Sequence, residues 1–256
     1  ILIFKKIQIL SLLKLMEQIH PKKWVKKFLE ALSKFKNILA IETSGLYCSV
    51  ALKSNGLITQ KATQEANKHG LVILDFIEDL LTKSNVKKED IDLIAVSNGP
   101  GSFTGLRVGC SVAQALAFAN NIPLLPISSL ANLAFQANCE FKKSNIFVIT
   151  NAHMKELYIG HYEFYKDQIK ILKKESLINL EELFEHIYEN SKETIYVGDG
   201  VGFLSKISKK NIYENLYSQA NNMFGLIKIA LKDKNFYLAE ELSPNYLSGE
   251  DHWQKS

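Results

Sequence analysis

Hydrophobic and polar positions change period several times between residues 38 and 127, and these changes predict a sheet packed against helices. Three apolar runs separated by polar turns predict a meander of strands, at 38–41, 47–52 and 57–60. Apolar residues then recur with helical spacing at 68–81 and 104–119, and buried-type strands are expected at 91–96 and 123–127. This order indicates an α/β fold with a mixed sheet flanked by helices.

A second unit with alternating helices and strands is predicted after residue 128. Helices are expected at 129–137, 180–188 and 220–231, and strands at 146–150, 157–165, 169–174 and 194–197. We therefore expect a first mixed-sheet domain at 37–128 and a second at 129–219. The segment at about 220–247 is a candidate to return to the first domain.

Residues 1–36 form a basic N-terminal extension. They hold nine lysines and two glutamates, so the rest of the chain is net negative although the whole carries +4. A negative body has no global field that attracts nucleic acid, so RNA binding would need a local patch or a partner. The stretch at 21–35 is typical of a basic amphipathic helix, which is either a surface for a partner or part of an upstream extension, with Met16 as a candidate start.

Composition argues against several classes of site and location. The apolar run at 1–15 is too short and too charged to span a bilayer, so no membrane association is expected. Cys48, Cys110 and Cys139 form no CxxC spacing, which favours a reducing cytoplasm over a disulfide framework or zinc ribbon. The six histidines form no HxxxH or HExxH pair, and no nucleophile and base stand in a readable arrangement. We therefore predict neither metal ligands nor catalytic residues.

Glycine is concentrated at 99–109, with the sequence GPGSFTGLRVG, between a buried strand and a helix. Free amides at a helix start attract anions, and Ser102 or Thr104 could cap them instead. The stretch lacks the Gly-Lys-Ser/Thr ending of a P-loop, so a phosphate loop and a tight packing turn both remain open.

Glu42 follows the first strand and precedes two hydroxyl residues, Thr43 and Ser44. A carboxylate at this place could hold a magnesium-bound water, or be merely solvated. Together with the turn Gly198-Asp199-Gly200, these features define candidate cofactor-binding residues of weak or vestigial character: Glu42, Ser44, Gly101, Ser102, Gly198 and Gly200.

Small residues recur every four positions within the helix at 104–119, at Gly105, Gly109, Ala113 and Ala117. Interior glycines cost about 1 kcal/mol each relative to alanine, so a close approach of another backbone should offset them. Two neighbours are open: the sheet of the same domain, or a helix of a second subunit.

The glycine block resembles the TsaB (YeaZ) family, and supporting pieces span about 37–247: ILAIETS at 38–44, SVAL at 49–52, IAV at 94–96, SSL at 128–130 and PNYL at 244–247. The resemblance implies the actin-like ATPase (ribonuclease H-like) fold in two mixed-sheet domains. It also implies a noncatalytic partner and assembly subunit of a complex that forms threonylcarbamoyladenosine at position 37 of tRNAs reading codons that start with A.

The partners implied by the resemblance are a TsaD-like catalytic subunit and a TsaE-like ATPase, with tRNA reached indirectly through the complex and a homodimer when alone. The catalytic relative has an HxxxH metal pair whose positions fall here at Ser129 and Leu133, which are not plausible ligands. No cofactor is then required by this chain, although ATP or ADP at the junction with the partner stays open.

In the family, the helix after the meander and the glycine helix form the subunit interface. The residues implied for that interface are Leu71, Leu74, Gly105, Gly109, Ala113 and Ala117, with Gly109→Leu or Ala113→Leu expected to lose pairing while the domain folds. The alternative is an enzyme, an actin-like ATPase or phosphotransferase acting alone, but it would need a base on its acceptor, and no carboxylate stands out for that role. A peptidase ranks last.

Overall fold

The computed structural model describes residues 35–64, 69–166, 168–187, 193–204, 211–230 and 236–247. The chain divides into two compact units, Ile1–Lys36 and Asn37–Ser256, and the second contains all the elements below. The amphipathic helix predicted at 21–35 lies outside the described residues except for its last position. Across the described part of the chain, no helix combines the length and the apolar character needed to cross a membrane.

Five strands form the first sheet in the order β3-β2-β1-β4-β5. Their bounds are β1 Ile38–Glu42, β2 Cys48–Ser54, β3 Leu57–Thr63, β4 Leu93–Gly99 and β5 Leu124–Ser128. The first three strands are antiparallel neighbours, which confirms the predicted meander, whereas β4 is parallel to β1 and β5 is parallel to β4. The sheet is therefore mixed, and its fully buried central strand β1 ends at Glu42.

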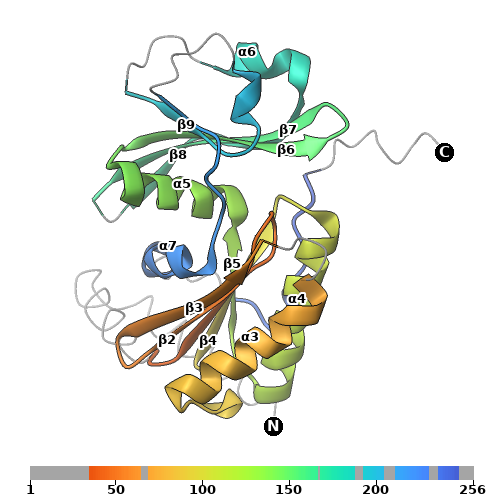
Figure 1. Cartoon of the computed structure of the whole chain (residues 1–256), viewed down its shortest axis with the longest axis vertical. Helices are drawn as coiled ribbons and strands as arrows, with labels where there is room; N and C mark the ends of the chain where they lie inside the picture. Colours follow the sequence, from red (N-terminus) through yellow and green to blue (C-terminus); the bar gives the residue numbers. More distant parts are fainter. Residues whose placement is uncertain are drawn as a thin grey trace, which may run out of the picture. The chain divides into compact units, whose positions relative to one another are not determined.

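Two helices, α3 (His69–Ser84) and α4 (Phe103–Asn120), cover one face of this sheet (Figure 1). The apolar stripe of α3 and the small residues of α4 share a core with β1 and β2. Ser102 starts α4 because its side chain accepts a hydrogen bond from the amide of Gly105, and Asn121 ends it in the left-handed conformation.

The second sheet repeats the connectivity of the first. Its order is β10-β9-β6-β7-β8, with an antiparallel meander β6-β7-β8 followed by β9 parallel to β6 and β10 parallel to β9. The bounds are β6 Asn145–His153, β7 Glu156–Tyr165, β8 Gln168–Asn179, β9 Ile195–Val197 and β10 Ile212–Tyr213. The chain thus contains the same five-stranded topology twice, which agrees with two related mixed-sheet halves.

Of the three helices expected after residue 128, the first is longer than predicted and the other two are shorter. Helix α5 (Ser129–Phe141) packs on one face of the second sheet, and α6 (Leu183–His186) with neighbouring 3-10 turns packs on the other. The helix predicted at 180–188 is therefore a 3-10 turn, Leu180–Glu182, followed by a single helical turn. The predicted apolar positions are nevertheless the buried ones, because Leu180, Leu183 and Ile187 pack in the same core.

The C-terminal segment leaves the second sheet and packs on the first half. A 3-10 turn at Ala220–Asn222 leads into α7 (Met223–Ala230), which contacts β5 and α5. Further along, Tyr237 forms an antiparallel bridge with Leu124, and the amide of Asn245 donates to the carbonyl oxygen of Asn98 at 2.6 Å. The helix expected at 220–231 is thus shorter, and the chain after it lies along β5 and α4.

Candidate functional site

Glu42 lies at the end of β1 with no exposed surface, and both oxygens of its carboxylate accept hydrogen bonds from the chain itself. One oxygen, Oε1, accepts from the amide and the hydroxyl of Ser44 at 2.7 and 2.5 Å. The other, Oε2, accepts from the hydroxyl of Ser218 at 2.7 Å and from the side-chain nitrogen Nδ2 of Asn132 at 3.2 Å. The carboxylate is therefore neither solvated nor free to hold a hydrated cation.

The residues around Glu42 join the two sheets. Asn132 comes from α5, and Ser218 comes from the segment that returns from β10 toward the first sheet. In the same segment, the amide of Ala220 donates to the hydroxyl of Ser49 on β2 at 3.0 Å. We call Glu42, Ser49, Asn132, Ser218 and Ala220 the inter-sheet clamp.

The glycine loop packs on the turn after Glu42. The amide of Ser102 donates to the carbonyl oxygen of Ser44 at 2.7 Å, and a methyl group added to Gly101 would stand 2.4 Å from that same oxygen. The hydroxyl of Thr43 donates to the carbonyl oxygen of Gly105 at 2.8 Å. Glycine is needed at position 101 because of this backbone contact.

Three backbone amides at this turn already have hydrogen-bond acceptors within the chain. In a phosphate-binding loop the amides point at the anion, whereas here those of Ser44, Ser102 and Gly105 all have acceptors within the chain. The Glu42 carboxylate places a negative charge beside them. The tight-turn reading of 99–109 therefore describes the structure better than the phosphate-loop reading.

Gly198 and Gly200 lie in a different place from the Glu42 cluster. Both pack on β6, where the amide of Gly200 donates to the carbonyl oxygen of Ile149 at 3.0 Å. Between them, Asp199 accepts from the amide of Asn151 at 2.9 Å, and burial raises the pKa of its carboxyl group. Of the six candidate cofactor residues, the structure thus brings together Glu42, Ser44, Gly101 and Ser102, and assigns the other two to packing on β6.

The small-residue ridge of α4 faces its own sheet, which corrects the prediction that these residues contact a partner. Gly105, Gly109, Ala113 and Ala117 are buried. A methyl group on Gly109 would stand 2.2 Å from the hydroxyl oxygen of Thr43. A methyl group on Gly105 would stand 2.0 Å from the carbonyl oxygen of Thr43. Glycine is required at both positions because Thr43, in the turn after β1, packs directly against the backbone of α4.

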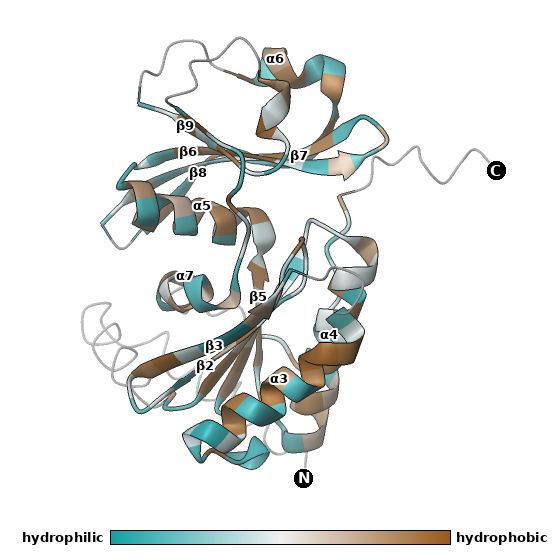
Figure 2. Ribbon diagram, viewed as in Figure 1, coloured by the Kyte–Doolittle hydropathy of each residue, from teal (hydrophilic) through white to brown (hydrophobic). Residues whose placement is uncertain are grey.

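Leu71 and Leu74 behave differently, because their side chains face outward on α3 with 74% and 58% of their surface exposed. Phe103 and Phe118 are also exposed, near the two ends of α4. Figure 2 shows hydrophobic residues on α3 near the point where it meets α4. We call Leu71, Leu74, Phe103, Arg107 and Phe118 the helix-pair surface.

The sequence patterns missed the aromatic part of this surface. In the sequence Phe103 is one residue of the glycine motif, yet in the structure it is half exposed and its ring lies 5.3 Å from that of Tyr246. The 4-3 spacing of exposed or half-exposed positions along α4, at Thr104, Val108, Ser111, Ala115 and Phe118, is a signal that could have indicated an outward seam.

The positions aligned with the metal pair of the catalytic relative are structural. The hydroxyl of Ser129 donates to the carbonyl oxygen of Pro100, and Leu133 is a core residue of the second sheet. Within the described ranges, no group of three or more metal-ligating side chains occurs. Burial raises the pKa of Cys48 and of Cys110 to about 11, so neither thiol supplies a thiolate near neutral pH.

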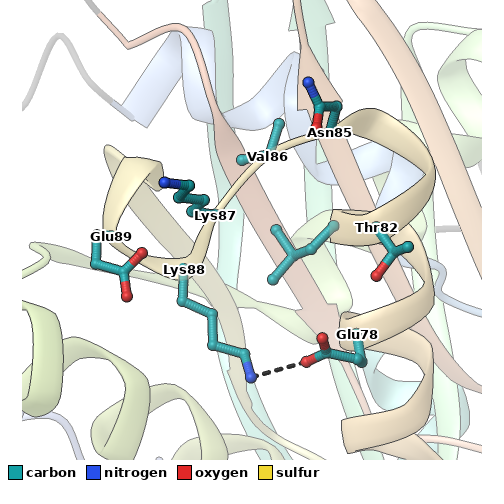
Figure 3. Close-up of a pocket in the computed structure, with 8 residues that line it drawn as sticks. Glu78, Thr82, Asn85, Val86, Lys87, Lys88 and Glu89 are labelled. Carbon is teal, nitrogen blue, oxygen red and sulfur yellow. Dashed lines mark ion pairs between the residues drawn. The ribbon is translucent and has the colours of Figure 1, made fainter.

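A shallow pocket of about 320 Å³ lies at the C-terminal end of α3 (Figure 3). Glu78 and Lys88 form an ion pair of 2.7 Å across its rim, and Leu81 and Val86 are among its lining residues. The eight lining residues offer no nucleophile with a base, and the pocket does not include any predicted site residue.

Comparison with known proteins agrees with this fold and these positions. Residues 56–239 match the family model described as TsaD, tRNA N6-adenosine threonylcarbamoyltransferase, so the chain belongs to the class of proteins with the TsaD-like fold. Within that class it belongs to the TsaB (YeaZ) family.

Individual relatives are similar over most of their length. The tRNA threonylcarbamoyladenosine biosynthesis protein TsaB of Haemophilus influenzae is 30% identical over 85% of this chain and 96% of its own. The protein of the same name from Buchnera aphidicola of Schizaphis graminum is 34% identical over 68% of this chain and 82% of its own. A solved structure of YeaZ from Pseudomonas aeruginosa superposes with a TM-score of 0.75 at 28% identity, covering 83% of this chain and all of that one.

Proposed function

We propose that this chain is the accessory subunit that binds and supports a TsaD-type catalytic subunit in forming threonylcarbamoyladenosine on tRNA, in the cytoplasm. Support comes from its relatives, which are biosynthesis proteins of that modification, and from its likeness to the TsaD model itself. Two subunits with the same fold can pair through equivalent helices, so the related fold favours pairing between relatives.

The observation that carries the proposal is the helix-pair surface. Large apolar side chains that stay exposed together mark protein interaction sites, and charged residues are depleted at the centre of such sites. Helix α4 has one charged residue, Arg107, in its 18 residues. We therefore assign the partner contact to the outward faces of α3 and α4, through Leu71 and Leu74, and not to the buried ridge.

A role without catalysis of its own accords with the inter-sheet clamp. The return segment fills the place between the two halves with Ser218, and the carboxylate that an ATPase would present to a hydrated metal is used internally. The rival role, an independent ATPase or phosphotransferase acting through Glu42, would need those internal bonds to open. We infer that the chain needs no cofactor and that any ATP or ADP binds at the junction with the partner.

The direct test is Leu71→Glu in the full chain, assayed for binding to the purified TsaD-type subunit. We expect a loss of about tenfold or more in affinity, since a carboxylate in a desolvated contact is unpaired. Leu57→Glu is the matched control: Leu57 is 73% exposed, but it lies on the edge strand β3, so its variant should bind as wild type does. Equal binding by both variants would refute the assignment of this surface.

Activity is tested by reconstitution. Purified TsaD-type subunit, TsaE-type ATPase and the adenylate-forming enzyme should modify tRNA when this chain is present and should not when it is absent. The same face should mediate a homodimer in the free chain, so Leu71→Glu should also shift a concentrated sample toward monomer in sedimentation. Full modification without this chain would contradict the accessory role, and direct tRNA binding by the free chain would contradict an indirect role toward tRNA.

A further inference from the structure

Arg107 is the single arginine among the 31 lysines and arginines of the chain. It lies on the exposed side of α4, one residue before Val108, whose side chain is the neighbour of Gly70 at the start of α3. Arg107 is therefore one residue away from the position at which α4 meets the start of α3.

Two aromatic residues hold the guanidinium group of Arg107. Its central carbon lies 3.7 Å from the centre of the Phe103 ring, one helical turn earlier on α4. Its Nε donates a hydrogen bond of 3.0 Å to the hydroxyl of Tyr246, and the two rings lie 5.3 Å apart. Tyr246 belongs to the C-terminal segment, which is fixed beside the loop by the bond from the amide of Asn245 to Asn98.

This arrangement uses the flat face and one donor of the guanidinium and leaves its two terminal nitrogens available. In the described part of the chain, Arg107 forms no ion pair. A lysine could supply the charge at this place, but not the stacking on Phe103 or the planar pair of donors. All the other basic residues of the chain are lysines, and its one arginine stands where the guanidinium both stacks on Phe103 and presents two parallel N–H donors.

The surroundings favour a carboxylate over nucleic acid as the group received. Recognition of a phosphate backbone relies on several cations in one patch. The helix pair has no such patch, because α4 contributes Arg107 alone and α3 contributes Asp75, Glu78 and Asp79 against Lys83. A single arginine flanked by exposed apolar and aromatic side chains is typical of the energetic centre of a protein interface.

We propose that Arg107 is the specificity residue of the helix-pair surface, where its two terminal nitrogens bind one carboxylate of the partner subunit. The inference rests on the proposed function, since the partner is the TsaD-type subunit. Phe103 and Tyr246 are positioning residues, because they fix the plane of the guanidinium before the partner arrives. Preorganisation of this kind lowers the entropy lost on binding.

The test measures the affinity of full-length variants for the purified TsaD-type subunit. Arg107→Lys keeps the charge and loses the fork, and we expect it to weaken binding by about tenfold or more. Tyr246→Phe keeps the ring and loses the acceptor for Nε, so its loss should be smaller, about threefold. Lys170→Ala is the control, since Lys170 is an exposed cation on β8 of the second sheet and should leave binding unchanged.

The outcomes separate the two proposals. If wild type binds the partner and Arg107→Lys binds within about twofold of it, the Arg107 inference is wrong and the proposed function stands. If wild type does not bind at all, the proposed function fails. Loss of tRNA binding in Arg107→Lys with unchanged partner affinity would also overturn the inference in favour of nucleic acid. Substitution of the partner's acidic residues should reveal one whose effect is lost in an Arg107→Ala background.

Discussion

The hydroxyl of Ser218 donates a 2.7 Å hydrogen bond to Oε2 of Glu42, although the two residues are 176 positions apart in the chain. Ser218 follows the last strand of the second sheet, and Glu42 ends the central strand of the first. The chain thus joins its two sheets through hydrogen bonds between its own side chains.

The first prediction concerns Glu42→Gln, which replaces one acceptor of the buried carboxylate with a donor that faces other donors. We expect the free energy of unfolding to fall by about 2–4 kcal/mol, because charge-assisted bonds from Ser44 and Ser218 are lost or reversed. Urea denaturation measures it. The control Glu78→Gln removes a carboxylate that is exposed and pairs with Lys88, so its effect should stay within about 0.5 kcal/mol. Equal effects in the two variants would show that the clamp contributes nothing.

A second prediction separates packing from partner binding on α4. Gly109→Ala should destabilise the domain by about 1–3 kcal/mol, because the added methyl group meets the hydroxyl of Thr43, which is bonded to Gly105. Gly70→Ala is the matched control on α3: its methyl group would meet only Val108, at 3.9 Å. That variant should be neutral or stabilised by up to about 1 kcal/mol, as alanine is the better helix former. Thermal or urea unfolding of both variants and wild type measures these differences in stability. A Gly109→Ala protein as stable as wild type would contradict the packing argument.

The sequence predicted the strands and helices of the first half well, because a buried sheet with helices on one face leaves strong periodic patterns. It could not decide whether Gly109 packs on the sheet of its own domain or on a second subunit, since a small residue permits close approach by either. The clamp was also invisible, because Asn132 and Ser218 meet Glu42 only after the chain has passed through the second sheet. Similarly, β10 has only two residues and no period to detect.

A third prediction concerns Glu175, a half-buried residue of β8 that the sequence patterns did not single out. It accepts from the hydroxyl of Tyr162 at 2.6 Å and from that of Ser128, which caps α5. Two irregularities in the pairing of β7 with β8 lie beside it, and Gly160 leaves room there for the Tyr162 ring. Burial raises the pKa of Glu175 above its ordinary value of 4.5 in the folded protein.

The sign follows from proton binding. Between the unfolded and folded pKa values of Glu175, the folded state holds more protons, so this group makes stability decrease as the pH rises from about 4.5. Glu175→Gln keeps the acceptor oxygen and removes the titration. Its stability relative to wild type should therefore improve with rising pH, by no more than about 1.4 kcal/mol per pH unit. Urea denaturation of both proteins across this range checks it. A difference that is flat with pH would contradict the prediction.

The last prediction addresses ATP turnover by the isolated chain. The amides that would receive a phosphate are bonded to Ser44, Ser102 and Glu42, and displacing those bonds would expose a buried carboxylate to an anion. Like charges at close range disfavour binding, so magnesium-dependent ATP hydrolysis by the free chain should equal that of a buffer blank. Glu42→Gln is the comparison variant, and circular dichroism first checks that it is folded. Hydrolysis by wild type that this variant abolishes would establish the rival role, that of an independent ATPase, whereas equal background rates in both would leave the chain as a binding subunit.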